Sequence, residues 1–105
     1  MSDKVGLYIT FWAAPGKIEA LIEALGPMID AVTSEVGTLA YGMHRVSGPL
    51  EGVSVYEIYA DADAQAVHGA SAPIEALKAK LPDLLGAPPE RFALSPIAGT
   101  KGLPF

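Results

Sequence analysis

Residues 5–12 alternate with the two-residue period of a β-strand. The two faces of this strand carry Val5, Leu7, Ile9 and Phe11 on one side, and Gly6, Tyr8, Thr10 and Trp12 on the other. Both sets are largely apolar, so the pattern predicts a strand that is covered on both sides. Ala14-Pro15-Gly16 follows as a break, and its proline suits the first turn of a helix.

The apolar period changes to that of an amphipathic helix between Lys17 and Glu35. The apolar stripe of this helix holds Ile18, Leu21, Ile22, Leu25, Ile29 and Val32. Gly26-Pro27 lies inside the stripe and predicts a kink or a break, because proline cannot donate the helical hydrogen bond. Gly37 is expected to end the helix.

Residues 38–46 and 53–60 are predicted to be the two strands of a β-hairpin. In the first of them, Leu39, Tyr41, Met43 and Arg45 alternate with Ala40, Gly42, His44 and Val46. The second is rich in β-branched and aromatic residues. The six residues between them, 47–52, have the composition of a turn.

A short helix is expected over residues 61–68, beginning at Asp61, since an acidic side chain suits the start of a helix. Gly69 and Pro73 break it. A second amphipathic helical segment, interrupted by Pro82, is marked by Ile74, Leu77, Leu81 and Leu84.

A shorter strand, residues 91–98, follows a stiff proline linker, and residues 99–105 form a tail without periodicity. The order of the elements is therefore β-α-β-β-α-β. In a ferredoxin-like arrangement both helical layers pack on one face of a four-stranded antiparallel sheet. The chain, residues 1–105, is thus predicted to be a single α+β domain whose core spans about residues 5–98.

This arrangement leaves the second face of the sheet without a helix to cover it. Tyr8, Trp12, His44 and Tyr56 are expected to point toward that face. Because an apolar sheet face needs a partner, we expect a two-fold symmetric homodimer joined sheet to sheet.

The composition narrows the class of protein. Half of the residues are hydrophobic and 18% are charged, which is too apolar for a disordered chain. The net charge is −5 and the seven Lys and Arg residues are not clustered, which argues against a nucleic-acid partner. No stretch approaches the roughly 18 apolar residues of a membrane span, so no membrane partner is expected.

The chain contains no cysteine, which excludes disulfide bonds, thiolate nucleophiles and zinc sites built on sulfur. Its start, Met1-Ser2-Asp3-Lys4, lacks the pattern of a signal peptide. We therefore expect a cytoplasmic protein. The spacing of His, Asp and Glu does not indicate a metal site, and no phosphate-binding glycine motif is present, so no cofactor is expected.

Three segments together resemble a known family. They are Ala14-Pro15-Gly16-Lys17 at the start of the helix, Val55-Tyr56-Glu57-Ile58-Tyr59 at the end of the third strand, and His68, nine residues beyond Tyr59. The pattern resembles the antibiotic-biosynthesis monooxygenase family over about residues 5–98. The resemblance implies a homodimer that closes a composite β-barrel (a dimeric α/β barrel), with a pocket in each subunit between the sheet and its helices.

The resemblance also implies a range of activities. Members oxidise aromatic quinols or polyketide intermediates with O₂ and without metal or flavin, while others degrade haem, isomerise a small sugar derivative or have no known activity. Haem-degrading members place an Asn on the first strand and a Trp and a His on the second helix, where this chain has Ile9, His68 and Lys78. This difference argues against haem degradation. The fold alone does not choose among the other activities.

Alternation along the strands sorts the candidate site residues. The face toward the helices is expected to carry Val5, Leu7, Ile9, Phe11, Leu39, Tyr41, Met43, Val53, Val55, Glu57 and Tyr59. Of these, the expected substrate-binding residues are Leu7, Ile9, Phe11, Tyr41, Met43 and Tyr59. The two tyrosines also suit a core position with a satisfied hydroxyl.

Glu57 and His68 are the candidate catalytic residues. Glu57 is the carboxylate in an otherwise apolar row, and a buried carboxylate must pair, accept hydrogen bonds or take up a proton. It would either orient His68 or a substrate hydroxyl, or serve as a structural residue. An imidazole titrates near neutral pH and suits proton abstraction from a phenol, although a histidine at a helix end also suits the helix dipole.

We therefore expect a cofactor-independent monooxygenase that acts on a small aromatic quinol or polyketide-like substrate. His68, oriented by Glu57, would remove a phenolic proton, and the anion would react with O₂ in a dry pocket. Two alternatives stay open: an isomerase that uses the same base for enolisation, and a non-catalytic binding or stress-response dimer. Whether Glu57 and His68 meet at one cavity separates the enzymatic interpretations from the last one.

Overall fold

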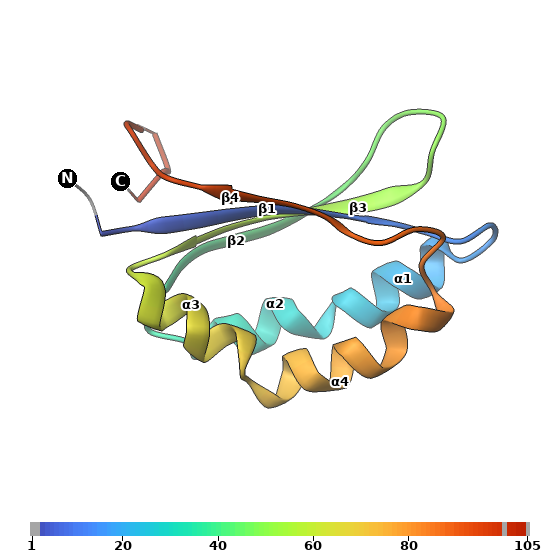
Figure 1. The fold of residues 1–105 in the computed structure, drawn as a ribbon, viewed down its shortest axis with the longest axis horizontal. Helices are drawn as coiled ribbons and strands as arrows, with labels where there is room; N and C mark the ends of the chain where they lie inside the picture. The colour runs from blue at the N-terminus through green and yellow to red at the C-terminus, as the bar shows by residue number, and fades with distance from the viewer. Residues whose placement is uncertain (1–2, 100, 105) are drawn as a thin grey trace.

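Four antiparallel strands form one sheet in the computed structural model, which describes residues 3–99 and 101–104 (Figure 1). The strands are β1 (Val5–Trp12), β2 (Thr38–Arg45), β3 (Gly52–Tyr59) and β4 (Glu90–Leu94), in the spatial order β2-β3-β1-β4. β1 is therefore an inner strand of the sheet, flanked by β3 and β4. The β2–β3 pair is the predicted hairpin.

The helices all lie on one face of this sheet (Figure 1). They are α1 (Ile18–Leu25), α2 (Pro27–Val32), α3 (Ala62–Gly69), α4 (Ala72–Lys80) and the 3-10 helix η1 (Leu81–Asp83). The predicted break at Gly26-Pro27 separates α1 from α2. The element order and the two layers confirm the α+β, ferredoxin-like fold. Within the described residues, no helix has the length and apolar character needed to cross a membrane.

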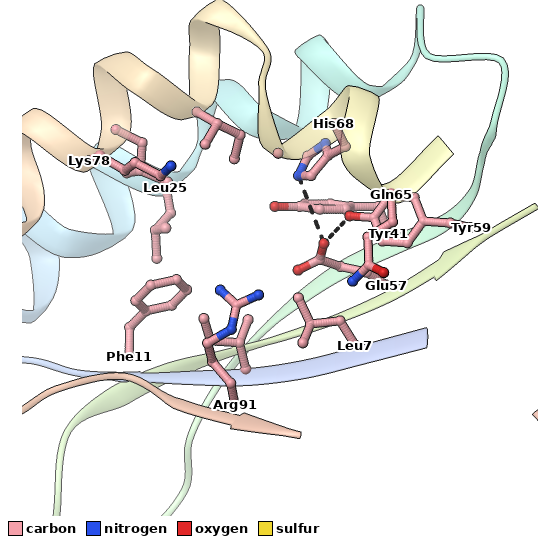
Figure 2. A pocket seen from close by; sticks show the side chains of 14 residues that line it. Leu7, Phe11, Leu25, Tyr41, Glu57, Tyr59, Gln65, His68, Lys78 and Arg91 are labelled. Atoms are coloured by element: carbon pink, nitrogen blue, oxygen red, sulfur yellow. Dashed lines mark hydrogen bonds and ion pairs between the residues drawn. The ribbon is translucent and has the colours of Figure 1, made fainter. Parts of the chain in front are cut away.

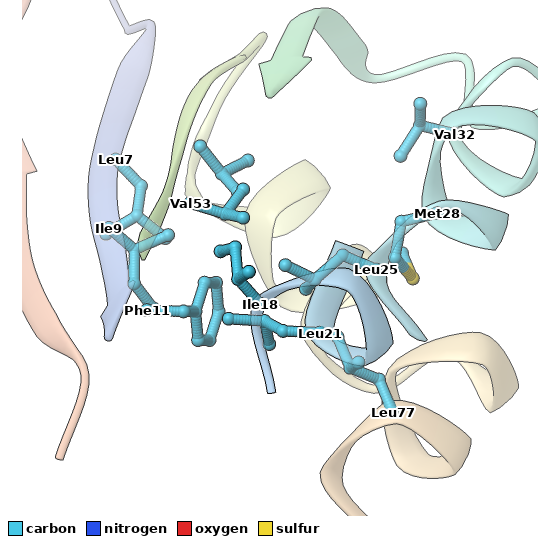
Figure 3. Packing of buried hydrophobic residues seen from close by; sticks show 11 residues of the cluster. Leu7, Ile9, Phe11, Ile18, Leu21, Leu25, Met28, Val32, Val53 and Leu77 are labelled. Atoms are coloured by element: carbon cyan, nitrogen blue, oxygen red, sulfur yellow. The ribbon is translucent and has the colours of Figure 1, made fainter. Parts of the chain in front are cut away.

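The hydrophobic core lies between the sheet and the helices (Figure 3). Its residues are Leu7, Ile9, Phe11, Val53 and Val55 from the strands, and Ile18, Leu21, Leu25, Met28, Val32 and Leu77 from the helices. The strand residues are the alternate positions predicted to face the helices. Most of the α1 and α2 residues come from the predicted apolar stripe. Both periodicities are therefore confirmed for these residues, whereas Ile29 of the predicted stripe is 42% exposed.

Leu39 is 40% exposed, and it lines a depression together with Ile29 and Val32 of α2. A β-bulge between Thr38 and Ala40 leaves it without a cross-strand partner. The alternation resumes at the next residue pair, so Tyr41 still faces the helices, opposite Glu57.

β4 is shorter than predicted. It ends at Leu94 rather than Ala98, and Pro96 just beyond it cannot donate a sheet hydrogen bond. Residues 99 and 101–104 of the predicted tail form neither helix nor strand, while Thr100 and Phe105 lie outside the described residues.

The sheet face opposite the helices carries an aromatic patch, defined as Tyr8, Tyr56 and Phe92. Tyr8 on β1 is in register with Tyr56 on β3 and with Phe92 on β4. Tyr8 is 38% exposed and Phe92 is 58% exposed. In the next row of the sheet, the Thr10 and Ser54 hydroxyls bond to each other at 2.8 Å, so these polar groups need no water. A second apolar surface would therefore cover this face with little loss of polar hydration.

Trp12 lies at one end of the same face. Its cross-strand partner is Gly52, where an added Cβ would come within 2.8 Å of the indole ring, so the packing requires a glycine. The indole Nε1 donates a hydrogen bond to Glu90 Oε2 at 3.0 Å. These contacts hold Trp12 away from the helix side of the sheet, as predicted.

We expect the protein to form a homodimer in solution through the aromatic patch. Phe92→Asp should convert the dimer to a monomer at micromolar concentration, because a charge would enter a desolvated interface. Trp12→Asp should act in the same direction. Sedimentation velocity measures both effects. Val36→Asp is the matched control, since Val36 is 97% exposed and lies outside the sheet; a monomeric wild-type protein would contradict the prediction.

Candidate active site

A cavity of about 210 Å³ lies between the sheet and helices α3 and α4 (Figure 2). Its apolar walls are formed by Leu7, Ile9, Phe11, Leu25, Ile74 and Leu77. Its polar side chains are Tyr41, Glu57, Tyr59, Gln65 and His68, with the cationic Lys78 and Arg91. The cavity therefore combines an apolar enclosure with a group of titratable residues.

The register of the sheet brings Glu57 to this cavity. Glu57 lies on β3 between Leu7 of β1 and Tyr41 of β2, and only 4% of its surface is exposed. Tyr59, two residues along the same strand and on the same face, donates its hydroxyl to Glu57 Oε1. Burial raises the pKa of Glu57, and the Tyr59 hydroxyl, His68 and Arg91 offset only part of that rise.

His68 lies in the last turn of α3 and is 6% exposed. The helix begins at Asp61, whose side chain accepts a hydrogen bond from the Ala64 N–H at 2.8 Å. His68 Nδ1 is 2.8 Å from Glu35 Oε1, and His68 Nε2 is 3.8 Å from Glu57 Oε1. The imidazole thus lies between two carboxylates that come from different elements of the fold.

Glu35 is a residue that the sequence interpretation did not place in the site. The predicted helix ends early: α2 stops at Val32, where the Thr33 hydroxyl donates to the Asp30 carbonyl. Glu35 therefore lies in the turn before β2 rather than on a helix. There the Thr38 hydroxyl also donates to Glu35 Oε1, at 2.7 Å, which holds the carboxylate in place.

Gly37 allows this turn and α3 to approach each other closely. A Cβ at residue 37 would overlap the Cβ of Ala64, so the approach requires a glycine. The Ala60 N–H donates to the Gly37 carbonyl at 2.8 Å and ties the same two segments together. This contact brings Glu35 within hydrogen-bond distance of His68, although 33 residues separate them in the chain.

Tyr41 and Tyr59 flank the imidazole, with ring centres 5.6 and 5.5 Å from the His68 ring. Burial, followed by the nearby Glu57, raises the pKa of both hydroxyls above the ordinary value for tyrosine. Both phenols therefore stay protonated at neutral pH and serve as donors. The Tyr59 hydroxyl is used by Glu57. Within the described residues the Tyr41 hydroxyl has no hydrogen-bond partner, which leaves it for a ligand.

The cavity brings together all of the predicted site residues except Met43. Met43 lies on β2, two strands away from Ile9, with Val55 of β3 between them. It lines a separate depression on the other side of the core. His44 is exposed on the opposite sheet face, as predicted. The catalytic and binding roles of the residues at the cavity stay predictions.

Gln65, Lys78 and Arg91 also line the cavity, although the sequence interpretation did not include them. Lys78 follows Ile74 by four residues, so helical spacing alone could have placed it beside that wall residue. Arg91 reaches the cavity because it pairs with Ile9 in the sheet. The alternation of one strand does not reveal such a register.

The arrangement supports proton transfer. Because Glu35 accepts the Nδ1–H of His68, Nε2 is the basic nitrogen that faces Glu57 and the cavity. A ligand hydroxyl at this end of the cavity would meet the Nε2 base and the Tyr41 donor together. Within the described residues, no group of three His, Asp or Glu side chains is arranged to hold a metal ion.

Fold and cavity agree with one class of proteins, the ferredoxin-like α+β domains with a pocket between sheet and helices. The sequence profile of the antibiotic biosynthesis monooxygenase family matches residues 5–80. The chain therefore belongs to the antibiotic biosynthesis monooxygenase family. No curated protein sequence matches it.

Several solved structures share the fold. Rv0793 of Mycobacterium tuberculosis is 23% identical with a TM-score of 0.86, over 93% of this chain and 99% of that protein. PA3566 of Pseudomonas aeruginosa is 26% identical with a TM-score of 0.85, over 93% of this chain and 98% of that protein. NE2512 of Nitrosomonas europaea, a protein of unknown function, is 26% identical with a TM-score of 0.81, over 93% of each chain. These likenesses support the fold and carry no activity over to this chain.

Glu57→Gln should stabilise the protein at neutral pH. Folding raises the pKa of Glu57 above its ordinary value of 4.5, so the folded chain keeps a proton that the unfolded chain releases. The free energy of unfolding therefore falls as the pH rises above about 4.5. Glutamine removes this loss and still accepts the Tyr59 hydroxyl.

Thermal unfolding at two pH values measures this effect. The variant should melt a few degrees above wild type at about pH 7, and the two should converge below about pH 4, where Glu57 is protonated in both states. Glu51→Gln makes the same charge change at an exposed position. If Glu57→Gln and Glu51→Gln changed the melting temperature by the same amount, the burial of Glu57 would not be the cause of the effect, and the prediction would be wrong.

Proposed function

We propose that the protein is a cofactor-independent monooxygenase that uses O₂ to oxidise a small quinol-type aromatic compound, with His68 as the general base. The observation that carries this proposal is the placement of His68 and Glu57 at an apolar cavity, with Glu35 bonded to the other ring nitrogen of His68. Membership in the antibiotic biosynthesis monooxygenase family supports the reaction class. A homodimer joined through the aromatic patch is part of the same proposal.

The first step is removal of a phenolic proton by His68 Nε2. Glu35 accepts the Nδ1–H, which fixes the tautomer and stabilises the imidazolium as it forms. The Tyr41 hydroxyl donates to the phenolate oxygen. Glu57, whose pKa is raised by burial, lies beside the transferred proton and favours its retention at this end of the cavity.

The anion then reacts with O₂, and a hydroquinone shows how the atoms balance. The electron-rich ring transfers an electron to O₂, and the two radicals combine to form a C–O bond at the carbon next to the ionised oxygen. The imidazolium proton completes a hydroperoxide. Nε2 next removes the proton on that carbon, the O–O bond breaks, and water leaves. The product is a hydroxyquinone, with one oxygen atom from O₂ in the product and the other in water.

The apolar walls protect the reactive anion. Leu7, Phe11 and Leu25 line the apolar part of the cavity, where the ring of the substrate would lie, and they exclude water from that ring. Because hydration stabilises a phenolate, a dry environment makes the anion a stronger electron donor toward O₂. The chain therefore contributes deprotonation, orientation and water exclusion.

The same base also supports an isomerase, in which Nε2 would remove an acidic C–H proton and return it to a neighbouring atom. Oxygen consumption separates this reaction from the monooxygenase. A non-catalytic binding dimer is the third function considered. The 3.8 Å separation of His68 Nε2 and Glu57 Oε1 at one cavity favours the two enzymatic functions over it.

His68→Ala should lower turnover of an oxidisable hydroquinone by about 10²–10⁴-fold, the usual contribution of positioned acid–base catalysis. Oxygen uptake with an electrode measures the rate. His68→Asn is the second variant, because its amide N–H can still donate to Glu35 and preserve the local fold. His44→Ala removes the other histidine of the chain from the opposite sheet face and should leave the rate unchanged. Equal oxidation by wild type, both His68 variants and buffer would exclude the proposed function.

Glu35→Gln should lower kcat by at least about 10-fold and change KM little, because a neutral amide no longer selects the Nδ1–H tautomer or stabilises the imidazolium. Steady-state oxygen uptake separates the two parameters. Glu23→Gln, a charge change at an exposed residue of α1, is the matched control. Unchanged kcat in Glu35→Gln would show that Glu35 has no part in orienting His68.

A further inference from the structure

The cavity has a cationic mouth, defined as Lys78 and Arg91. Both residues line the cavity and both are exposed, whereas Glu57 and His68, which also line it, are buried. Arg91 pairs with Ile9 in the sheet, which directs its side chain to the helix side. Figure 2 shows its guanidinium pointing into the cavity between Phe11 and Glu57.

The Arg91 guanidinium makes no hydrogen bond or close ion pair with another described residue, and its link to the rest of the site is its electrostatic attraction to Glu57. Lys78 has a weak partner on its own helix, Glu75, at 3.4 Å, and both of these side chains are largely exposed. The five donors of an arginine fork are therefore available to a ligand at this point. The chain carries a net charge of −5 and only seven Lys and Arg residues. Two of these cations line one cavity, so the cavity has a local positive charge that the protein as a whole does not have.

The size of the cavity limits the ligand to a single ring. A cavity of about 150 Å³ holds one benzene molecule. The 210 Å³ here leaves room for one ring with small substituents. Phe11, Leu25 and Leu77 supply apolar surface for its faces and edges.

We infer that the cavity takes a single-ring phenol or hydroquinone that carries a carboxylate, with the hydroxyl at His68 and the carboxylate at the cationic mouth. The assignment of the hydroxyl end rests on the proposed function, while the carboxylate end rests on Arg91 and Lys78 alone. An arginine fork matches a carboxylate in a bidentate geometry. At the exposed mouth, the carboxylate also keeps part of its hydration, which reduces the cost of binding it.

The two ends of the cavity also exclude the reversed orientation. A ligand carboxylate placed beside Glu57 would meet an acidic side chain in a buried environment, with the Glu35 carboxylate close behind His68. The same repulsion favours a neutral hydroxyl at that end. The site therefore selects both the ligand and its direction, by attraction at the mouth and repulsion at the buried end.

Anaerobic titration calorimetry with matched ligands tests this inference without turnover. The ligands are 2,5-dihydroxybenzoate, its methyl ester and unsubstituted hydroquinone. In wild type, the benzoate should bind at least about 10-fold more tightly than the ester, since a charge-assisted pair is lost in the ester. Raising the salt concentration should weaken binding of the benzoate and leave the ester unaffected.

Arg91→Gln should remove most of the preference for the benzoate and leave ester binding unchanged. Arg91→Lys, which keeps the charge but not the fork, should retain part of the preference. The matched control is Arg45→Gln, since Arg45 is also a strand arginine but pairs with Glu19 at 2.9 Å, away from this cavity. It should bind all three ligands as wild type does. Equal affinity of wild type for the benzoate and the ester, or an equal loss for both in Arg91→Gln, would overturn the carboxylate site.

Oxygen uptake under air keeps this result separate from the proposed function. Arg91-dependent binding of the benzoate without oxygen uptake would support the carboxylate site and exclude the monooxygenase. Oxygen uptake with all three ligands, together with equal binding of acid and ester, would support the monooxygenase and overturn the carboxylate site.

Discussion

The burial of one carboxylate in the apolar face of the sheet is the constraint around which the cavity is organised. Glu57 could not lie there, at 4% exposure, without polar partners, because an isolated buried charge is strongly unfavourable. Tyr59 donates to it from the same strand, and His68 approaches it from α3. Glu57, Tyr59 and His68 therefore form a polar group inside the otherwise apolar core, and the cavity lies next to this group.

Local periodicity was sufficient to predict most of the fold and part of the site. The alternation of residues 5–12 and 53–60 placed Leu7, Glu57 and Tyr59 on the helix side, because side-chain direction in a strand follows from position alone. The bulge at Leu39 is a local irregularity that leaves Leu39 without a cross-strand partner, while Tyr41 keeps its predicted direction. Periodicity along one strand does not predict where such a bulge lies.

The residues that the sequence did not reveal depend on contacts between distant segments. Glu35 reaches His68 only because α2 ends early and Gly37 admits α3 beside the turn. Arg91 reaches the cavity only through the register of β4 with β1. Neither contact can be seen in the repeat of hydrophobic positions along the sequence, because each depends on how two distant segments pack together. The sequence thus indicated His68 and Glu57, and the fold added Glu35, which bonds to His68, and Arg91, which lines the cavity.

Helix α3 has an unusual anchor. Among its described residues, Ala62–Gly69, His68 alone is buried. The helix is thus held to the sheet largely through the same imidazole that faces the cavity, rather than through a row of apolar side chains. Local opening of α3 would separate His68 from both Glu35 and Glu57 and take the imidazole away from the cavity. Amide hydrogen exchange in this helix would report directly on how often the site is assembled.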